Sequence, residues 1–264
     1  MRGIIRHGHV DYRCDGPLAT VTLDSPASGN LVDAAMAEGL RDVCRAIAQD
    51  DSVRLVVITG KGGVFSVGRP TPPDPRHSVG PDGALDWIYR HQVASAVAEL
   101  PVPVIAAVNG DALDQGLELA LAADLRIAAA DARFGFDTLG QGAIPWDGGT
   151  QRLPRLIGSA WALDMILTGR TIDANQAFAV GLVNRVVPAD KLLDETRKLA
   201  ESVLAGAPIA ARYAKEAVHK GMDLSLDQGL RLEADLNILL HGTSDRAEGL
   251  HSFLERRDPE FSGQ

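Results

Sequence analysis

Short runs of β-branched residues alternate with helical stretches through the first two thirds of the chain, and this alternation constrains the fold more than any other feature. It is typical of layered α/β structures, and not of β-sandwiches or helical bundles. A chain of 264 residues is long enough for one large α/β domain with a smaller appendage. We therefore predict an α/β fold with strands over residues 19–23, 55–59, 104–108 and 125–128.

Two helices and a loop are predicted between these strands. Residues 33–49 carry apolar side chains at helical spacing, and Asp33 is suited to cap the first turn. Residues 85–100 predict a second helix, which cannot continue through Pro101. Residues 71–83 are crowded with Pro, Gly and Asp, and they predict an exposed loop of the kind that often covers a substrate.

The C-terminal quarter carries no strand signal. We expect a main domain over residues 1–190 and a helical region over residues 191–264. Helices such as that over residues 226–240 have more apolar surface than a small appendage could bury, which predicts packing on the main domain or on another subunit. The helices of this region are predicted over residues 191–205, 209–220, 226–240 and 244–256.

Composition excludes several classes of protein. A net charge of −9 without a cluster of Lys and Arg argues against nucleic-acid binding. The sequence has neither an apolar run long enough to span a membrane nor a secretory signal, so we expect a soluble cytoplasmic protein. Its two cysteines make no disulfide framework and have no metal-ligand spacing. We expect no metal, nicotinamide or flavin, because no ligand cluster or dinucleotide fingerprint is present.

The strongest chemical signal is one carboxylate in an apolar helix. A helix predicted over residues 115–123 follows a strand and the pair Asn109-Gly110, and Glu118 is the only charge among its apolar residues. The start of such a helix offers N–H groups to a developing oxyanion. Burial would raise the pKa of the Glu118 carboxyl toward a value useful for proton transfer. The alternative is a structural ion pair between Glu118 and an arginine.

Two further segments rich in glycine follow strands. Residues 60–69 could aim a backbone N–H group into a cleft or form an ordinary turn. Residues 134–153 contain Asp147, just before a helix that is predicted to start at Thr150. Asp147 is either a catalytic group or a turn and cap residue, and the local sequence favours the cap.

Taken together, these segments resemble the crotonase superfamily, also called the enoyl-CoA hydratase/isomerase family, over nearly the whole chain. The order and spacing of the matches carry the resemblance, more than any single match does. The matches are Ile58-Thr59-Gly60 with Phe65-Ser66-Val67-Gly68, Val108-Asn109-Gly110 with Glu118-Leu119-Ala120, Ala123-Asp124-Leu125-Arg126-Ile127-Ala128, Gly148-Gly149-Thr150-Gln151-Arg152-Leu153-Pro154-Arg155, Leu167-Thr168-Gly169-Arg170, Gly181-Leu182-Val183-Asn184-Arg185-Val186-Val187 and Phe253-Leu254-Glu255-Arg256-Arg257.

The resemblance implies a right-handed spiral of ββα units and a helical C-terminal region that forms a homotrimer or a hexamer. It implies an acyl-CoA thioester as substrate, with coenzyme A as part of the substrate and no other cofactor. The thioester oxygen would be held by the backbone N–H groups of Arg69 and Gln115. The family usually has a small residue after the position of Gly68 and three glycines where this chain has Asp114, Gln115 and Gly116.

The resemblance also assigns the carboxylates. Glu118 matches a catalytic carboxylate of the family's hydratases, but the second hydratase carboxylate falls at Thr138, which is a poor base. Asp147 coincides with an aspartate of dienoyl-CoA isomerases and lies near one in family members that hydrolyse β-diketones. We expect Glu118 and Asp147 to be acid and base, with Gly68, Gly116, Thr138 and Trp146 in the substrate pocket.

The predicted function is proton transfer or double-bond isomerisation on an enoyl or dienoyl acyl-CoA through an enolate. One alternative is an enoyl-CoA hydratase, with Asp137 replacing the missing carboxylate, or a β-dicarbonyl hydrolase. Another is a catalytically silent acyl-CoA-binding protein. Tyr89 and His91, on the helix before Pro101, could face the pocket, but a position on the helix surface is favoured for both.

Overall fold

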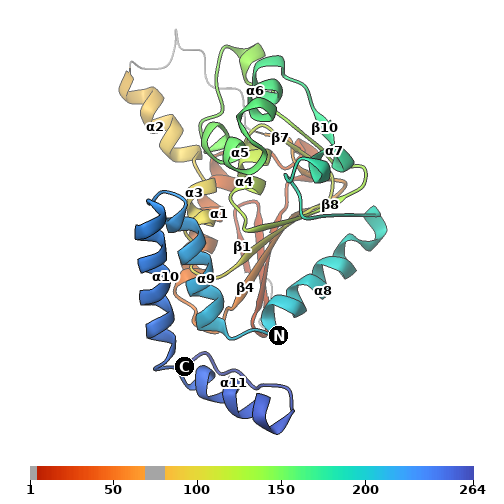
Figure 1. Cartoon of the computed structure of the whole chain (residues 1–264). Coiled ribbons are helices and arrows are strands. Elements are labelled where there is room, and N and C mark those ends of the chain that lie inside the picture. Colours follow the sequence, from red (N-terminus) through yellow and green to blue (C-terminus); the bar gives the residue numbers. More distant parts are fainter. Residues whose placement is uncertain (1–4, 69–80) are drawn as a thin grey trace.

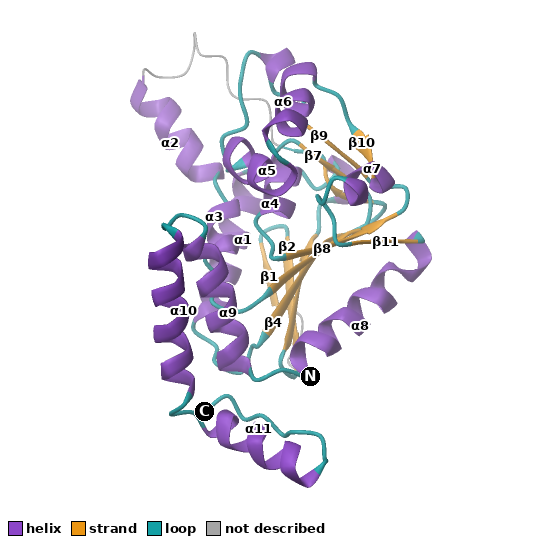
Figure 2. Ribbon diagram, in the orientation of Figure 1, coloured by secondary structure: helices purple, strands orange, loops and turns teal. Residues whose placement is uncertain are grey.

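The structure is a computed structural model that describes residues 5–68 and 81–264. Two sheets and a set of surrounding helices build its described part, as Figure 2 shows. The strands are β1 Ile5–His7, β2 Val10–Asp15, β3 Leu18–Leu23, β4 Leu55–Gly60, β5 Val64–Ser66, β6 Val104–Val108, β7 Asp111–Leu113, β8 Leu125–Ala129, β9 Arg133–Gly135, β10 Ile172–Asp173 and β11 Arg185–Val187. The helices are α1 Ala34–Ala48, α2 Pro81–His91, α3 Ala94–Ala98, α4 Gln115–Leu121, α5 Gly149–Ile157, α6 Ser159–Thr168, α7 Ala174–Ala179, α8 Leu192–Leu204, α9 Pro208–Gly221, α10 Leu226–Leu240 and α11 Ser244–Glu255, with short 3-10 turns at Pro26–Ser28, Leu139–Gln141 and Ala189–Lys191.

The larger sheet has the strand order β1-β2-β3-β4-β6-β8-β11. The first three strands form an antiparallel meander, and β3, β4, β6, β8 and β11 run parallel. The four predicted strands are all confirmed, with ends that differ by at most one residue. β4 and β6 consist of β-branched and other apolar residues because both faces of these strands are buried.

The smaller sheet has the order β10-β9-β7-β5, with β5, β7 and β9 parallel. Along the chain, β4 and β5, then β6 and β7, then β8 and β9 each contribute one strand to each sheet before helices follow. Parallel strands joined in this way are connected with right-handed crossovers. The expected spiral of ββα units is thereby confirmed.

The larger sheet has apolar layers on both sides. One layer contains α1, α3 and α4 together with most of the buried residues. On the other side, Leu55, Ile105 and Ile127 pack against Leu192 and Leu199 of α8. Figure 1 shows α8 crossing this second face of the sheet. The first helix after the predicted boundary at residue 190 thus covers the main sheet.

The helix predicted over residues 33–49 is confirmed as α1, and Asp33 caps it by accepting a hydrogen bond from the N–H group of Met36 at 2.8 Å. The single helix predicted over residues 85–100 is wrong, because the chain forms α2 and α3 with a break at Gln92 and Val93. Of the loop predicted over residues 71–83, residues 71–80 lie outside the described residues. Residues 81–83 form the first turn of α2.

Four helices follow residue 190, as predicted, and α9 and α10 lie side by side in Figure 1. Asp124 joins α9 to the sheet: its Oδ2 atom accepts a hydrogen bond from the N–H group of Val104 and lies 2.9 Å from Nζ of Lys215. In this single chain α10 and α11 expose large apolar side chains, which include Leu226, Ile238, Phe253 and Leu254. No helix of the described residues is long and apolar enough to cross a membrane.

Candidate active site

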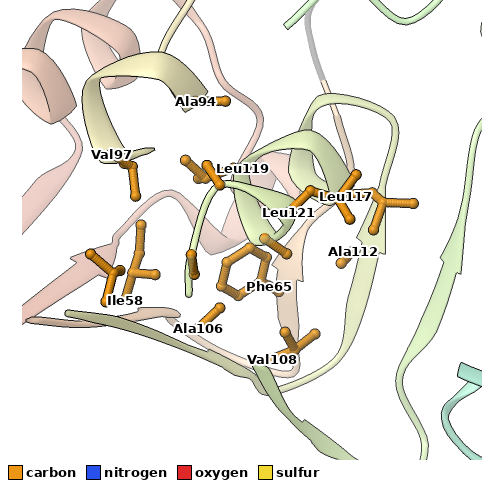
Figure 3. Close-up of a cluster of buried hydrophobic side chains, with 14 of the residues drawn as sticks. Ile58, Phe65, Ala94, Val97, Ala106, Val108, Ala112, Leu117, Leu119 and Leu121 are labelled. Carbon is orange, nitrogen blue, oxygen red and sulfur yellow. The ribbon is translucent and has the colours of Figure 1, made fainter. Parts of the chain in front are cut away.

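Helix α4 lies at the centre of the molecule and carries Glu118. Figure 3 shows Leu119 and Leu121 of this helix beside Phe65, with Ala106 and Val108 of β6 on the other side of the ring. All of these side chains are buried. Every residue of α4 is buried as well, so Glu118 is held in an apolar helix as the sequence predicts.

Glu118 is 1% exposed, and two backbone amides bind its carboxylate. The Oε1 atom accepts a hydrogen bond from the N–H group of Asp147 and another from the N–H group of Gly149, both at 2.8 Å. These bonds join α4 to the start of α5. The sequence left open an ion pair with an arginine, whereas the partners of Oε1 are main-chain amides.

Asp147 is also 1% exposed, and its Oδ2 atom is surrounded by donors. It accepts hydrogen bonds from the N–H groups of Val93 at 2.9 Å and Ala94 at 3.1 Å, and from Nε2 of Gln115 at 3.0 Å. Burial raises the pKa of the Asp147 carboxyl, and these hydrogen bonds and the charge of Arg152 oppose that rise. The Oδ1 atom has no hydrogen-bond partner in the described part of the chain.

The break between α2 and α3 has its cause at Asp147. The N–H groups of Val93 and Ala94 leave the helical ladder and donate to the carboxylate, so Asp147 caps the start of α3. The local sequence favoured Asp147 as a cap for the helix at residue 150, but Gly148 occupies that N-cap position. Asp147 is therefore a cap, but of a helix more than 50 residues away in sequence.

The segments predicted to form an oxyanion hole meet at the start of α4. Gly68 has a φ of +108°, and an added Cβ atom would lie 2.9 Å from Cβ of Asp114, the N-cap residue of α4. Gly116 lies against β5, because an added Cβ atom would be 2.1 Å from the carbonyl oxygen of Ser66. Gln115 is fully buried as the first residue of α4. Arg69 lies outside the described residues.

The remaining predicted pocket residues differ in their surroundings. Thr138 is 1% exposed, and its Oγ1 atom has no hydrogen-bond partner among the described residues. Asp137, which the hydratase alternative would use, has an exposed side chain, while its N–H group donates to Asp114. Trp146 is partly buried and lies 5.4 Å from Trp87, measured between ring centroids.

Trp87 and His91, which contact Trp146 and Gln115, are two residues that the sequence did not assign to the site. His91 is buried, contrary to its predicted surface position, because its ring stacks on Trp87 at 4.4 Å and its carbonyl oxygen accepts a hydrogen bond from Gln115. Tyr89 is exposed, as predicted. The spacing of Trp87 and His91 by four residues is the signal that could have placed both on one helix face. In the described part of the chain, no cluster of His, Cys, Asp and Glu is arranged to hold a metal ion.

Comparison with known proteins identifies the family. The family model for enoyl-CoA hydratase/isomerase matches residues 14–264. The YngF protein of Bacillus subtilis, which is named for the same family, is 40% identical over 248 residues, covering 93% of this chain and 95% of YngF. A crotonyl-CoA hydratase of Syntrophomonas wolfei is 36% identical, covering 92% of this chain and 94% of the relative.

A solved structure agrees with the sequence comparison. The crystal structure of an enoyl-CoA hydratase from Bacillus anthracis superposes with a TM-score of 0.91 at 36% identity, covering 97% of this chain and all of the other. Family model, sequence relatives and fold therefore agree over nearly the whole length. The chain belongs to the enoyl-CoA hydratase/isomerase family of the crotonase superfamily and is an acyl-CoA enzyme of that family.

Proposed function

We propose that the enzyme moves a proton, and with it a double bond, along an enoyl or dienoyl acyl-CoA. The observation that carries this proposal is that two buried carboxylates, those of Glu118 and Asp147, belong to residues joined directly by the hydrogen bond from the main-chain N–H group of Asp147 to Glu118 Oε1. Each carboxyl group can accept or donate one proton, which is the requirement for a reaction that removes a proton at one carbon and returns one at another.

The proposed reaction leaves the composition of the substrate unchanged, because one proton is removed and one is returned. One carboxylate of the pair removes a proton from the acyl carbon, the C–H electron pair moves toward the thioester, and an enolate forms. The other carboxyl group donates a proton further along the chain, so one C–H bond breaks, one forms and the double bond migrates. The raised pKa of Asp147 favours its protonated form, as a proton donor requires.

The enolate needs hydrogen-bond donors near its oxygen. We place the backbone N–H group of Gln115 in this role because Gln115 is the first residue of α4, where an N–H group has no partner within the helix. The backbone of Arg69, which follows Gly68, is the proposed second donor. Coenzyme A would enter as part of the substrate, and no further cofactor takes part in these steps.

Thr138 argues against water addition as the main reaction. A hydratase of this family is expected to hold one water between two carboxylates, and a threonine cannot ionise to replace one of them. The exposed side chain of Asp137 does not join the buried pair. The S. wolfei relative is named a crotonyl-CoA hydratase, which keeps hydration as the second candidate.

The test is incubation of the purified protein with saturated, enoyl, dienoyl and β-keto acyl-CoA thioesters in deuterium oxide, followed by mass spectrometry. Deuterium uptake with a shifted double bond supports the proposal. Addition of water or cleavage of a β-keto compound would identify a hydratase or a hydrolase. Binding without any turnover would make the protein an acyl-CoA binder and refute the proposal.

Two isosteric variants assign the roles. Glu118→Gln and Asp147→Asn should each reduce turnover by about a hundredfold or more, the range for loss of a general acid or base. Gln92→Met is a matched control because the side chain of Gln92 donates a 3.3 Å hydrogen bond to the carbonyl oxygen of Trp146 and not to either carboxylate. Full turnover in both carboxyl variants would exclude the proposed pair.

We further propose that the protein assembles as a homotrimer or as a hexamer. The support is the exposed apolar surface of α10 and α11, on which Leu226, Phe253 and Leu254 are each more than three quarters exposed in the single chain. Sedimentation equilibrium or light scattering measures the state directly, and a monomer at micromolar concentration would refute it. The predicted cytoplasmic location stays a prediction.

A further inference from the structure

We infer that Gln115 is the positioning residue of the Asp147 carboxyl group: its side-chain amide holds Oδ2 and leaves Oδ1 as the oxygen that exchanges protons. The inference rests on the proposed function, in which Asp147 takes part in proton transfer. It concerns the side chain of Gln115, whereas the proposed function uses only its backbone N–H group.

The orientation of the Gln115 amide is fixed by two acceptors. Its Nε2 atom donates to the carbonyl oxygen of His91 at 2.5 Å and to Oδ2 of Asp147 at 3.0 Å. A carbonyl oxygen can only accept, so the nitrogen and not the oxygen of the amide must face His91. Both N–H bonds of the amide are then used, and the side chain is fully buried between the two partners.

The consequence for Asp147 is that its two oxygens differ. Oδ2 accepts three hydrogen bonds, from Val93, Ala94 and Gln115, whereas Oδ1 has no partner among the described residues. A proton placed on Oδ2 would displace one of these donors, while a proton on Oδ1 displaces none. A proton on Asp147 therefore resides on Oδ1, and Gln115 supplies the side-chain donor to Oδ2 among the described residues, beside the two main-chain donors.

Other charged groups around Asp147 do not replace this contact. Glu118 binds the N–H group of Asp147, and Arg152 donates through Nη1 to its carbonyl oxygen at 2.8 Å. His91 contacts Gln115 through its own carbonyl oxygen. The contacts of Glu118 and Arg152 are with the main chain of Asp147 and that of His91 is with the Gln115 amide, so Gln115 is the side chain among these that donates to the carboxylate.

The experiment measures the titration of the Asp147 carboxyl directly, by NMR of aspartate labelled at the side-chain carboxyl carbon, with Asp147→Asn to assign the signal. In Gln115→Met, which keeps the length of the side chain and removes its donors, the titration midpoint should rise by about one pH unit or more. In the matched control Gln92→Met the midpoint should stay at its wild-type value, because Gln92 binds the carbonyl of Trp146.

Gln115→Glu provides a second variant of nearly identical shape if Gln115→Met does not fold. A second carboxyl group beside Asp147 disfavours ionisation of both, so the midpoint should again rise. An unchanged midpoint of Asp147 in a folded Gln115 variant would overturn the inference, whatever the rate of turnover.

The pH dependence of turnover separates this inference from the proposed function. If Asp147 exchanges protons with the substrate, the limb of the pH–rate profile that reports Asp147 moves upward together with the NMR midpoint. A raised midpoint with an unchanged pH–rate profile would leave Gln115 as the residue that positions Asp147 and would refute the proposed role of Asp147 in the reaction.

Discussion

A single added methyl group at Gly149 should damage both the stability and the activity of the enzyme. In Gly149→Ala the new Cβ atom would lie 2.7 Å from Cβ of Pro145, 2.9 Å from Cζ of Phe136 and 3.0 Å from Oε1 of Glu118. Normal carbon contacts are about 3.5–4.0 Å, so all three neighbours must move. Both Pro145 and Phe136 are buried and packed, which leaves little room for relaxation.

The size of the effect follows from two separate terms. Overpacking of a core costs about 1–3 kcal/mol, and the higher helix propensity of Ala at the start of α5 returns at most about 1 kcal/mol. The same displacement lengthens the 2.8 Å bond from Gly149 N–H to Glu118. A hydrogen bond to a charged group contributes about 1.5–3 kcal/mol, so kcat/KM should fall by about ten- to a hundredfold.

Urea unfolding and steady-state kinetics on the same preparation measure both terms. Gly63→Ala is the control, because an added Cβ atom at Gly63 meets no atom within 4 Å. We expect Gly63→Ala to resemble the wild type in both assays. Wild-type stability and turnover in Gly149→Ala would show that the segment before α5 is not held against Glu118 as described.

Three further perturbations follow from buried groups. The pKa of Asp147 is raised in the folded state, so the folded protein keeps the Asp147 proton at pH values where the unfolded chain has lost it. The Asp147 carboxyl therefore stabilises the fold less as the pH rises above 3.8. Urea unfolding at a series of pH values above 3.8 should show Asp147→Asn gaining stability relative to the wild type. Arg126 is 4% exposed and donates to the carbonyl oxygens of Leu182 and Ala123, so Arg126→Met should lose about 3 kcal/mol by urea unfolding through unsatisfied carbonyls, whereas a loss below about 1 kcal/mol would contradict this role. Burial raises the pKa of the Cys44 thiol to about 12, so Cys44 should be alkylated in mildly alkaline buffer only after the protein unfolds. Rapid alkylation of Cys44 in the native protein would contradict its burial.

The strands and α1 could be predicted because their signals are local. The apolar runs of β4 and β6 and the helical spacing after Asp33 lie within a few residues of one another, and the structure confirms all of them. The apolar setting of Glu118 was equally local, because the neighbouring residues on α4 are apolar.

The break between α2 and α3 could not be predicted in the same way. The sequence around Gln92 and Val93 continues the helical pattern, and the partner that interrupts it, Asp147, comes from a different turn of the spiral. For the same reason the local sequence around Asp147 gave a cap for α5, and not the contacts to α3 and Glu118. Contacts between turns of the spiral depend on the packing of the whole chain.

At this site, carboxylate oxygens accept the main-chain hydrogen bonds that carbonyl oxygens accept within regular helices and strands. The N–H groups of Val93 and Ala94 donate to Asp147, and those of Asp147 and Gly149 donate to Glu118. Exchange of these hydrogens with solvent therefore depends on the charge and position of two side chains as well as on unfolding. The exchange rates of these four amide hydrogens therefore report the protonation of Glu118 and Asp147 without any substrate or assay of turnover.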